Sequence, residues 1–188
     1  MSPSDFWALL DGPGLHEIRC RYSEGPARVW LPTDCKRPFE RLIRSDDCFV
    51  SAVPRRHEDS YTLGAAHVLW ARLERPECAE RLARLPAGPT LVLREGRSSR
   101  RTALWALSRP LWGEWIDRAN ARLAHAVKGR RGAADASQLV LSPFTRLTNA
   151  KRPVSIYVEY ESDTYATARQ IVGALPDAPA LDGWRAAA

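Results

Sequence analysis

The chain has 188 residues, 45% of them hydrophobic, which is enough apolar sequence to bury the core of one domain. Its seven tryptophans and its hydrophobic content exclude a disordered protein, and no apolar run approaches the ~18 residues of a membrane span. Lysine and arginine outnumber aspartate and glutamate by 28 to 22, so the net charge is +6. This excess favours a polyanionic partner, although a biased genome can also produce an arginine-rich composition.

The first third of the chain predicts a short helix, a hairpin and a second helix. Ser4 is placed to cap a helix over residues 5–10. Residues 17–22 alternate apolar and charged side chains, as in a half-buried strand, and residues 27–31 form its hairpin partner. Residues 36–45 are predicted to be helical.

The middle of the chain alternates strand pairs with helices. A polar loop that begins with two arginines separates the first two strands, and a helix over 76–85 follows them. The next two strands form a hairpin around GRSSRR, the densest basic loop up to that point. The four predicted strands lie at residues 48–54, 66–73, 89–95 and 102–107.

The clearest helix is predicted over residues 114–129, where apolar side chains share one face and Gly129 ends the helix. Basic residues gather after it, where the helix dipole alone would favour them. Further strands are predicted at 138–141 and 154–160, followed by a helix capped by Asp163. Strands paired by hairpins and separated by helices predict an α+β fold with a mostly antiparallel sheet and packed helices.

Composition also indicates where the domain ends and where the protein resides. After residue 175, Ala, Pro and Gly predominate, so we expect one domain over residues 1–175 and a flexible tail over 176–188. The four cysteines have no CxxC spacing, so we expect free thiols in a reducing compartment. The N-terminus resembles no signal peptide, which favours a cytoplasmic protein. Three tryptophans are expected in the core rather than stacked on bases: Trp105, Trp112 and Trp115.

Three segments in the first two thirds of the chain carry a family resemblance. VSAVPRR (residues 50–56) is a strand that ends in Pro-Arg, and VLWARLE (68–74) is a hydrophobic run that ends in charges. PTLVLREGRSSRRTALWALSRP (89–110) is a strand, a glycine-containing loop and a strand. Between about Phe6 and Tyr160 this order resembles the archaeo-eukaryotic primase superfamily, in particular the RepB-like and bifunctional primase-polymerase domains of plasmids, phages and other mobile elements.

The resemblance implies an RRM-like core and a site for metal-dependent nucleotidyl transfer. In the family, two acids on one strand and a third aspartate hold divalent cations, and a histidine binds the triphosphate. Glu74 and Asp135 match two of the acids, but Arg72 stands at the first acid and Thr102 at the histidine. A guanidinium cannot coordinate Mg²⁺, so the two replacements indicate lost catalysis. Arg72 and Glu74 could form an ion pair that fills the vacated site, or could be solvated charges at an ordinary strand end.

The resemblance and the basic loops together predict the residues that contact nucleic acid. They lie in the loop after the Pro-Arg strand, on the catalytic strand, in the hairpin loop, after the long helix, and in the segment that matches the family's closing Asn-x-Lys. For the loops, incidental solvated charge is the alternative interpretation. The predicted residues are Arg55, Arg56, Arg72, Arg97, Arg100, Arg101, Arg130, Arg131, Asn149, Lys151 and Arg152.

Three functions follow as hypotheses. The first is a catalytically degenerate, DNA-binding protein that assists replication of a mobile element, with single-stranded or primed DNA as partner, no cofactor and no membrane. The second is an active primase or polymerase that uses Mg²⁺ or Mn²⁺ with Glu74, Asp135 and a further acid such as Asp59, Glu159 or Glu161. The third is a protein interaction module that docks on a replication helicase.

Overall fold

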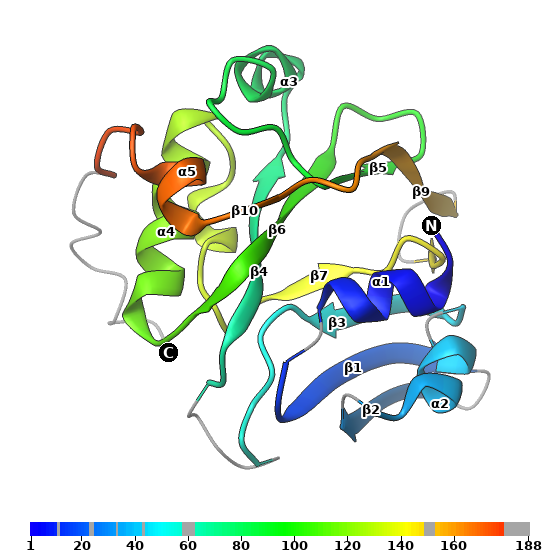
Figure 1. Ribbon diagram of the computed structural model, residues 1–188. Helices are drawn as coiled ribbons and strands as arrows, with labels where there is room; N and C mark the ends of the chain where they lie inside the picture. Colours follow the sequence, from blue (N-terminus) through cyan, green and yellow to red (C-terminus); the bar gives the residue numbers. More distant parts are fainter. Residues whose placement is uncertain are drawn as a thin grey trace.

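Two β-sheets and five α-helices make up the part of the chain that the computed structural model describes (Figure 1). The described residues are 1–10, 12–22, 25–32, 34–42, 44–57, 63–148 and 153–178. The first sheet has the order β2-β1-β3-β7, and all of its pairings are antiparallel. Its strands are β1 (Leu15–Tyr22), β2 (Gly25–Pro32), β3 (Asp46–Ser51) and β7 (Leu139–Leu141).

The second sheet is built around one long strand, β6. This strand pairs antiparallel with β4 along one edge, and with β5 and the short parallel strand β10 along the other. Beyond β5 the sheet continues through β9 to β8. The strands are β4 (Ala66–Leu73), β5 (Leu91–Glu95), β6 (Arg101–Leu111), β8 (Arg146–Leu147), β9 (Val154–Glu161) and β10 (Tyr165–Ala166).

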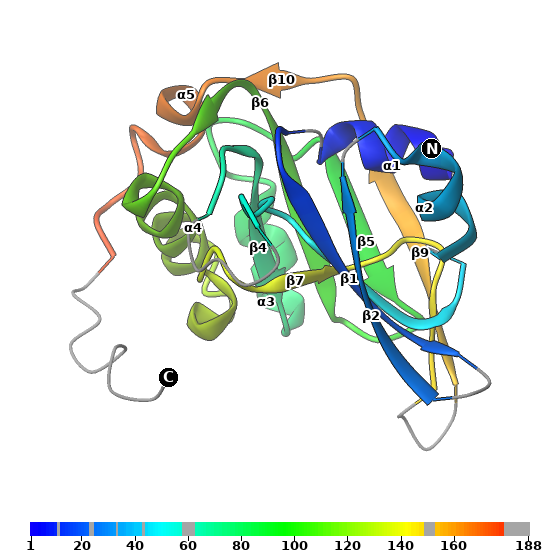
Figure 2. The ribbon, with the colours of Figure 1, turned by 90° about the horizontal axis from the view of Figure 1, so that it is seen from below.

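The second sheet is buried on both faces, because side chains alternate along each strand. On β4, Val68 and Trp70 join a core shared with the first sheet and the helices α1 (Pro3–Leu9) and α2 (Lys36–Leu42). Leu69 and Ala71 face a second core formed with the remaining helices. These are α3 (Pro76–Leu82), α4 (Glu114–Ala126) and α5 (Ala168–Val172). Figure 2 shows α1 and α2 on the β9 side of the molecule and α4 on the opposite side.

The predicted α+β class, with mostly antiparallel sheets and packed helices, is confirmed, but two predicted caps are wrong. The hydroxyl of Ser2, not Ser4, accepts a hydrogen bond from the Asp5 amide, because Pro3 already occupies the first helical turn. The last helix begins after Thr167 rather than Asp163, since Thr167 forms a reciprocal capping box with Gln170.

The tryptophan and cysteine predictions had mixed outcomes. Trp105 is buried as predicted, whereas Trp112 and Trp115 are 51% and 59% exposed, so the prediction of core packing is wrong for these two. They lie at the β6–α4 turn and in the first turn of α4, where the apolar stripe has not yet begun. All four cysteines are free, and burial raises the pKa of the Cys48 thiol.

Two further observations concern the C-terminal boundary of the predicted domain and the possibility of a membrane-spanning helix. Leu175 is buried against the second core, and residues 179–188 of the predicted tail lie outside the described residues. Among the described helices, none combines the length and the apolar character that a membrane crossing would need.

Candidate nucleic-acid interface

The pairing of β4 with β6 places Arg72 directly opposite Thr102. Thr102 is also opposite Leu93 of β5, so the two positions lie in the middle of the second sheet. Because alternate residues share a face, Arg72 lies on the same side as Trp70, and this side faces the first sheet. The two positions where the resemblance expects an acid and a histidine are therefore neighbours in the fold.

Glu95 completes this cluster, although sequence analysis did not select it. Its Oε1 accepts a hydrogen bond from Arg72 Nη2 at 3.2 Å, and its Oε2 lies 3.8 Å from Arg100 Nη1. The Glu95 side chain is 8% exposed, and that of Arg72 is 29% exposed. The alternation of Leu91, Leu93 and Glu95 along β5 places this carboxylate on the core face, which is the signal that could have identified it.

Arg72 retains unused hydrogen-bonding capacity in this cluster. Its Nε is buried and has no hydrogen-bond partner among the described residues. A buried donor without an acceptor costs about 1–3 kcal/mol. Two guanidiniums with one carboxylate leave the Arg72–Glu95–Arg100 cluster with one net positive charge.

The predicted Arg72–Glu74 ion pair is wrong. Strand β4 ends at Leu73, so Glu74 lies beyond the regular strand, and its exposed carboxylate is 3.4 Å from Arg130 Nη1. Arg72 instead pairs with Glu95, which lies on the same face of the second sheet.

The chain after α4 is tied to the end of β4 and brings further arginines there. The Arg130 amide donates to the Arg72 carbonyl at 2.8 Å. A Cβ at Gly129 would lie 2.6 Å from the same carbonyl oxygen, so only glycine allows this approach. The helix ends at Ala126, three residues before the predicted end, and Lys128 has a φ of +53°. Arg131 lies nearby, 3.4 Å from His125 Nδ1.

Asp135 has a different environment from the Arg72–Glu95–Arg100 cluster. Its Oδ1 accepts a hydrogen bond from the Ser137 amide, while Asp117 Oδ1 accepts from the Ala136 amide at 2.6 Å. Burial raises the pKa of Asp117, and the nearby Asp135 carboxylate raises it further.

The described residues do not supply the acid set that the resemblance implies for Mg²⁺ or Mn²⁺. Within the described ranges, no three His, Cys, Asp or Glu side chains come together in a way that could hold a metal ion. Of the further candidate acids, Glu161 pairs with the N-terminal amine at 2.8 Å, Glu159 pairs with arginines, and Asp59 lies outside the described residues.

The arginines in and beside the loop between β5 and β6 lie on both faces of the sheet. Arg97 and Arg100 line a cavity of about 380 Å³ together with Glu95 and Leu147. Arg101 lies on the opposite face, where Arg101 Nη2 and Arg94 Nη1 contact Glu159 Oε1 at 2.9 and 3.0 Å. Hydrogen bonds from Arg101 lower the pKa of Glu159, and the same contact raises the pKa of Arg101.

The remaining predicted contact residues lie apart from the hairpin. Arg55 is beside the first sheet, with its guanidinium 3.9 Å from Glu17 and 5.6 Å from the ring centre of Trp30, and Arg56 is exposed. Three predicted residues lie outside the described residues: Asn149, Lys151 and Arg152.

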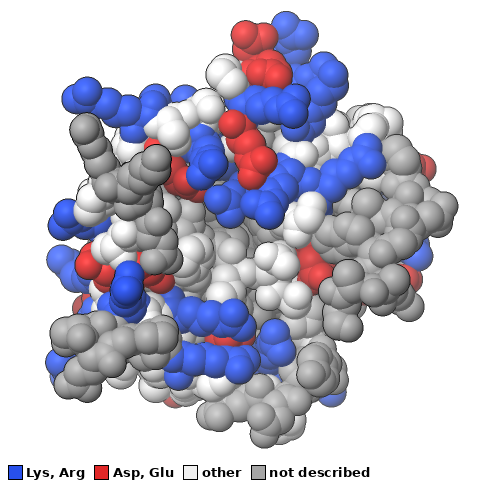
Figure 3. All heavy atoms as spheres, turned by 180° about the vertical axis from the view of Figure 1, so that it is seen from behind, with Lys and Arg blue, Asp and Glu red and all other residues white. Residues whose placement is uncertain are grey.

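The face opposite to that of Figure 1 carries a hollow between basic side chains. Figure 3 shows lysine and arginine side chains gathered above and below this hollow. Because the view is turned about the vertical axis, the lower group lies over the region of β1 and β2, and the upper group lies over the part that includes α3. A polyanion bound in the hollow would thus have basic residues on both sides.

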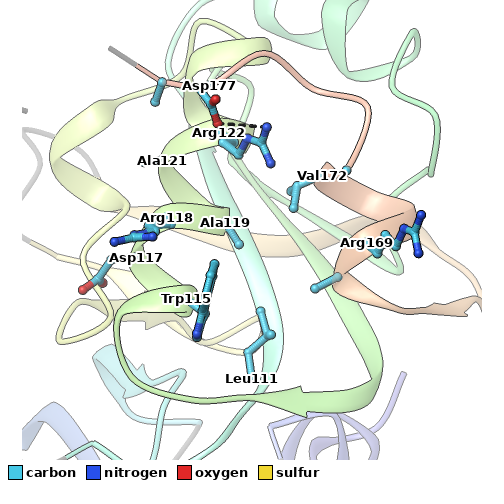
Figure 4. Close-up of a pocket in the computed structure, with 13 residues that line it drawn as sticks. Leu111, Trp115, Asp117, Arg118, Ala119, Ala121, Arg122, Arg169, Val172 and Asp177 are labelled. Atoms are coloured by element: carbon cyan, nitrogen blue, oxygen red, sulfur yellow. Dashed lines mark ion pairs between the residues drawn. The ribbon is translucent and has the colours of Figure 1, made fainter. Parts of the chain in front are cut away.

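A separate groove of about 700 Å³ lies between α4 and α5 (Figure 4). The exposed ring of Trp115 and the side chains of Leu111 and Val172 line it. Arg122 on α4 pairs with Asp177 at 2.9 Å on its rim. This groove belongs to the second core and not to the face that carries Arg72.

Comparison with known proteins identifies the fold. No protein-family model matches the sequence, and no curated protein matches it significantly. The structure is similar to the AEP domain of the primase-polymerase of cyanophage S-2L, with a TM-score of 0.67 and 11% sequence identity over 91% of this chain and 95% of that domain.

Two structures of primase RepB′ are also similar. Its catalytic domain in complex with initiator DNA has a TM-score of 0.61 and 14% identity over 89% of each chain. The structure of primase RepB′ itself gives 0.60 and 13% identity, and covers 88% of this chain but 59% of that one. The chain therefore has the fold of archaeo-eukaryotic primase-polymerase domains.

Proposed function

We propose that the chain is a DNA-binding protein with a primase-polymerase fold and a degenerate catalytic site, and that it assists the replication of a plasmid, phage or other mobile element. Its structural neighbours are a primase-polymerase domain and primase RepB′, and one of these structures is a primase catalytic domain in complex with initiator DNA. These likenesses support a role in replication. The charges of the cluster around Arg72 support binding without catalysis.

The single observation that carries the proposal is the Arg72–Glu95 ion pair. It lies on the strand that resembles the family's catalytic strand, opposite the position of the family's histidine. A carboxylate that is already bound by guanidiniums is a weak ligand for a divalent cation. The net positive charge of the cluster also repels such a cation. The same charge attracts phosphate, and the planar guanidinium matches phosphate geometry.

The proposed DNA contacts surround this ion pair. Arg97 and Arg100 flank Glu95 in the hairpin loop, and Arg130 follows the end of β4. We include in the same interface Arg131 and the Asn149, Lys151 and Arg152 segment that resembles the family's closing loop. Single-stranded or primed DNA is the proposed partner, held mainly through its phosphate backbone.

Fluorescence anisotropy with labelled single-stranded and primed oligonucleotides tests the binding. The logarithm of the association constant should fall linearly with the logarithm of the salt concentration, by about 0.7 for each phosphate contact on a single strand. A flat salt dependence, or no binding to either oligonucleotide, would contradict the proposal.

Primer extension with Mg²⁺ or Mn²⁺ tests the degenerate site. We expect no nucleotide incorporation by the wild-type protein under conditions where it binds the primed template. Incorporation that disappears in both Glu74→Ala and Asp135→Ala would establish the alternative, an active metal-dependent primase or polymerase.

A second candidate function is docking on a replication helicase. The exposed Trp115 in the groove between α4 and α5 favours a protein contact there, because aromatic side chains in pockets often anchor interfaces. Pull-down from the native host after nuclease treatment, compared with Trp115→Ala, tests it. Helicase recovery that depends on Trp115 and resists nuclease would support docking.

Two further parts of the proposal concern the chain as a whole. We place the protein in the cytoplasm, and its free thiols support a reducing compartment. Residues 1–175 are proposed to form one domain. Limited proteolysis that leaves this fragment intact would support the boundary, whereas an early cut within it would contradict it.

A further inference from the structure

The outer face of the first sheet holds two arginines side by side. Strands β1 and β2 pair so that Arg19 is directly opposite Arg28. Ile18 and Cys20 point into the core, so Arg19 lies on the other face of the sheet. Cross-strand partners are about 4.5–5.5 Å apart at Cβ, and like charges in such pairs are destabilising. An opposite charge must therefore hold this pair together.

A buried glutamate supplies that charge. The Glu17 side chain is 1% exposed, and its Oε1 accepts hydrogen bonds from the Nε of both Arg19 and Arg28, the latter at 2.7 Å. Arg55 Nη2 lies 3.9 Å from the other carboxylate oxygen. Burial raises the pKa of Glu17, but the hydrogen bonds from Arg19 and Arg28 outweigh burial and lower it. One carboxylate among three guanidiniums leaves an excess of two positive charges.

Trp30 completes the support for these arginines. Its ring lies directly across from Glu17, with the guanidinium carbon of Arg28 at 4.8 Å and that of Arg55 at 5.6 Å from the ring centre. Such cation–π contacts fix the planes of the two guanidiniums.

The exposed edges of Arg19 and Arg28 remain available to a ligand. Their side chains are 55% and 52% exposed. Glu17 contacts both arginines through their Nε atoms, while more than half of each side chain stays open to solvent. Two fixed guanidinium edges on adjacent strands form a site for a phosphate group.

The neighbouring residues favour a linear polyanion over a small anion. Arg21 lies two positions along β1 on the same face, about 6.6 Å from Arg19 along the strand, and is also 55% exposed. This is similar to the spacing of successive phosphates in an extended single strand. The lower basic group in Figure 3 lies over this region and borders the hollow.

We infer that the Glu17-anchored arginines Arg19 and Arg28 bind the phosphate backbone of single-stranded DNA, as a second contact region beyond the Arg72–Glu95–Arg100 cluster. This inference rests on the proposed DNA-binding function. It adds the first sheet to the binding surface, and it assigns Glu17 as the residue that positions both guanidiniums.

The test compares two double variants that each remove two positive charges. Arg19→Gln/Arg28→Gln acts on the proposed surface, and Arg118→Gln/Arg169→Gln removes exposed arginines from α4 and α5, on the other side of the second sheet. Affinity for labelled oligo-dT is measured by anisotropy across a salt series. For the first variant, we expect the slope of log association constant against log salt concentration to fall by about 1.4 in magnitude and the affinity to fall about tenfold. For the second variant, the affinity should change less than about twofold.

A third variant separates charge from geometry and guards against misfolding. Arg19→Lys/Arg28→Lys keeps the charges around Glu17 but loses the planar guanidinium. It should keep the wild-type salt slope and bind several-fold more weakly. Equal affinity of the lysine variant and the wild type would overturn the phosphate geometry proposed here.

The outcomes also distinguish this inference from the proposed function. If the wild-type protein does not bind oligo-dT, the proposed function fails. If it binds, and Arg19→Gln/Arg28→Gln keeps the full salt slope while Arg72→Gln/Arg100→Gln loses part of it, only the present inference is overturned. A slope loss seen with oligo-U but not with oligo-dT would overturn the assignment to DNA.

Discussion

An arginine–glutamate cluster lies on each face of the β5–β6 hairpin. The two clusters differ in how many of their hydrogen-bonding groups have partners. On one face Glu159 accepts hydrogen bonds from Arg94 and Arg101, and the pKa of the carboxyl is lowered. On the other face Glu95 is more deeply buried, its contacts with Arg72 and Arg100 are 3.2 and 3.8 Å long, and the buried Nε of Arg72 lacks a partner among the described residues.

This difference distinguishes arginines that stabilise the fold from arginines that can bind a ligand. The Glu159 cluster uses its donors internally, so Arg101, although it was predicted to contact phosphate, is engaged in the fold. The Glu95 cluster leaves donors unused and faces the first sheet. We therefore expect the Glu95 face to contribute to the proposed DNA binding and the Glu159 face to contribute to stability.

The largest effect should come from Gly129→Ala, which disturbs the contact between the segment after α4 and the end of β4, where Arg72 lies. The new Cβ would lie 2.6 Å from the Arg72 carbonyl oxygen and force α4 away from β4. We expect the free energy of unfolding to fall by about 1–3 kcal/mol, together with a loss of DNA affinity. Urea denaturation measures the change.

Gly88→Ala is the matched control for this substitution. A Cβ at Gly88 would have no atom within 4 Å, so its stability should be unchanged or slightly higher. Equal stability of the two variants would show that the Gly129 contact does not constrain the end of β4.

The next effect concerns the Glu159 face. Arg94→Gln/Arg101→Gln removes both partners of a partly exposed carboxylate, and we expect a loss of about 1 kcal/mol in the free energy of unfolding. DNA affinity should stay within about twofold of the wild type. A large loss of affinity with unchanged stability would reverse the two assignments.

The pH dependence of stability tests whether the Glu159 cluster stabilises the fold. The pKa of Glu159 is lowered in the folded chain, so its stabilisation is present above its unfolded pKa of about 4.3 and is lost as the pH falls through the folded value. The stability difference between wild type and Glu159→Gln should therefore shrink below about pH 4. Urea titrations at pH 7 and pH 3 measure it, and a constant difference would rule out this titration.

The smallest effect should have the opposite sign. Burial raises the pKa of Asp117, so the folded chain favours its protonated form, and this contribution is lost as the pH rises through the raised pKa. Asp117→Asn keeps an oxygen for the Ala136 amide and should be slightly more stable at pH 7. The gain should be less than about 0.5 kcal/mol, because the carboxylate is only partly buried and solvent still screens it. At pH 3 the two proteins should be equally stable, so a stability gain that persists there would contradict this assignment.

The alternation of apolar and polar residues and the residues typical of turns made much of the fold predictable from the sequence. The alternating segments at β1 and β9, the two hairpins and the long α4 all lie close to their predicted positions. The helix caps were less predictable, since Ser2 and Ser4 are both good capping residues and the choice depends on where Pro3 enters the helix.

The candidate site was predictable only in part. The opposition of Arg72 and Thr102 follows from the register of β4 and β6, and the resemblance anticipated it. The partner of Arg72 did not follow, because Glu74 is nearer in sequence whereas Glu95 is brought close only by the sheet. Glu17 escaped selection because alternation along β1 marks it as a surface residue, and its burial comes from the arginines that cover it.

The roles of the two faces can be separated by measuring the salt dependence of single-stranded DNA binding for Arg72→Gln/Arg100→Gln and for Arg94→Gln/Arg101→Gln. Each variant removes two arginines, the first from the Glu95 face of the second sheet and the second from the Glu159 face. We expect the slope of log association constant against log salt concentration to fall by about 1.4 in magnitude for the first variant and to stay at the wild-type value for the second. Equal slopes for the two variants, or a loss confined to the second, would contradict this expectation.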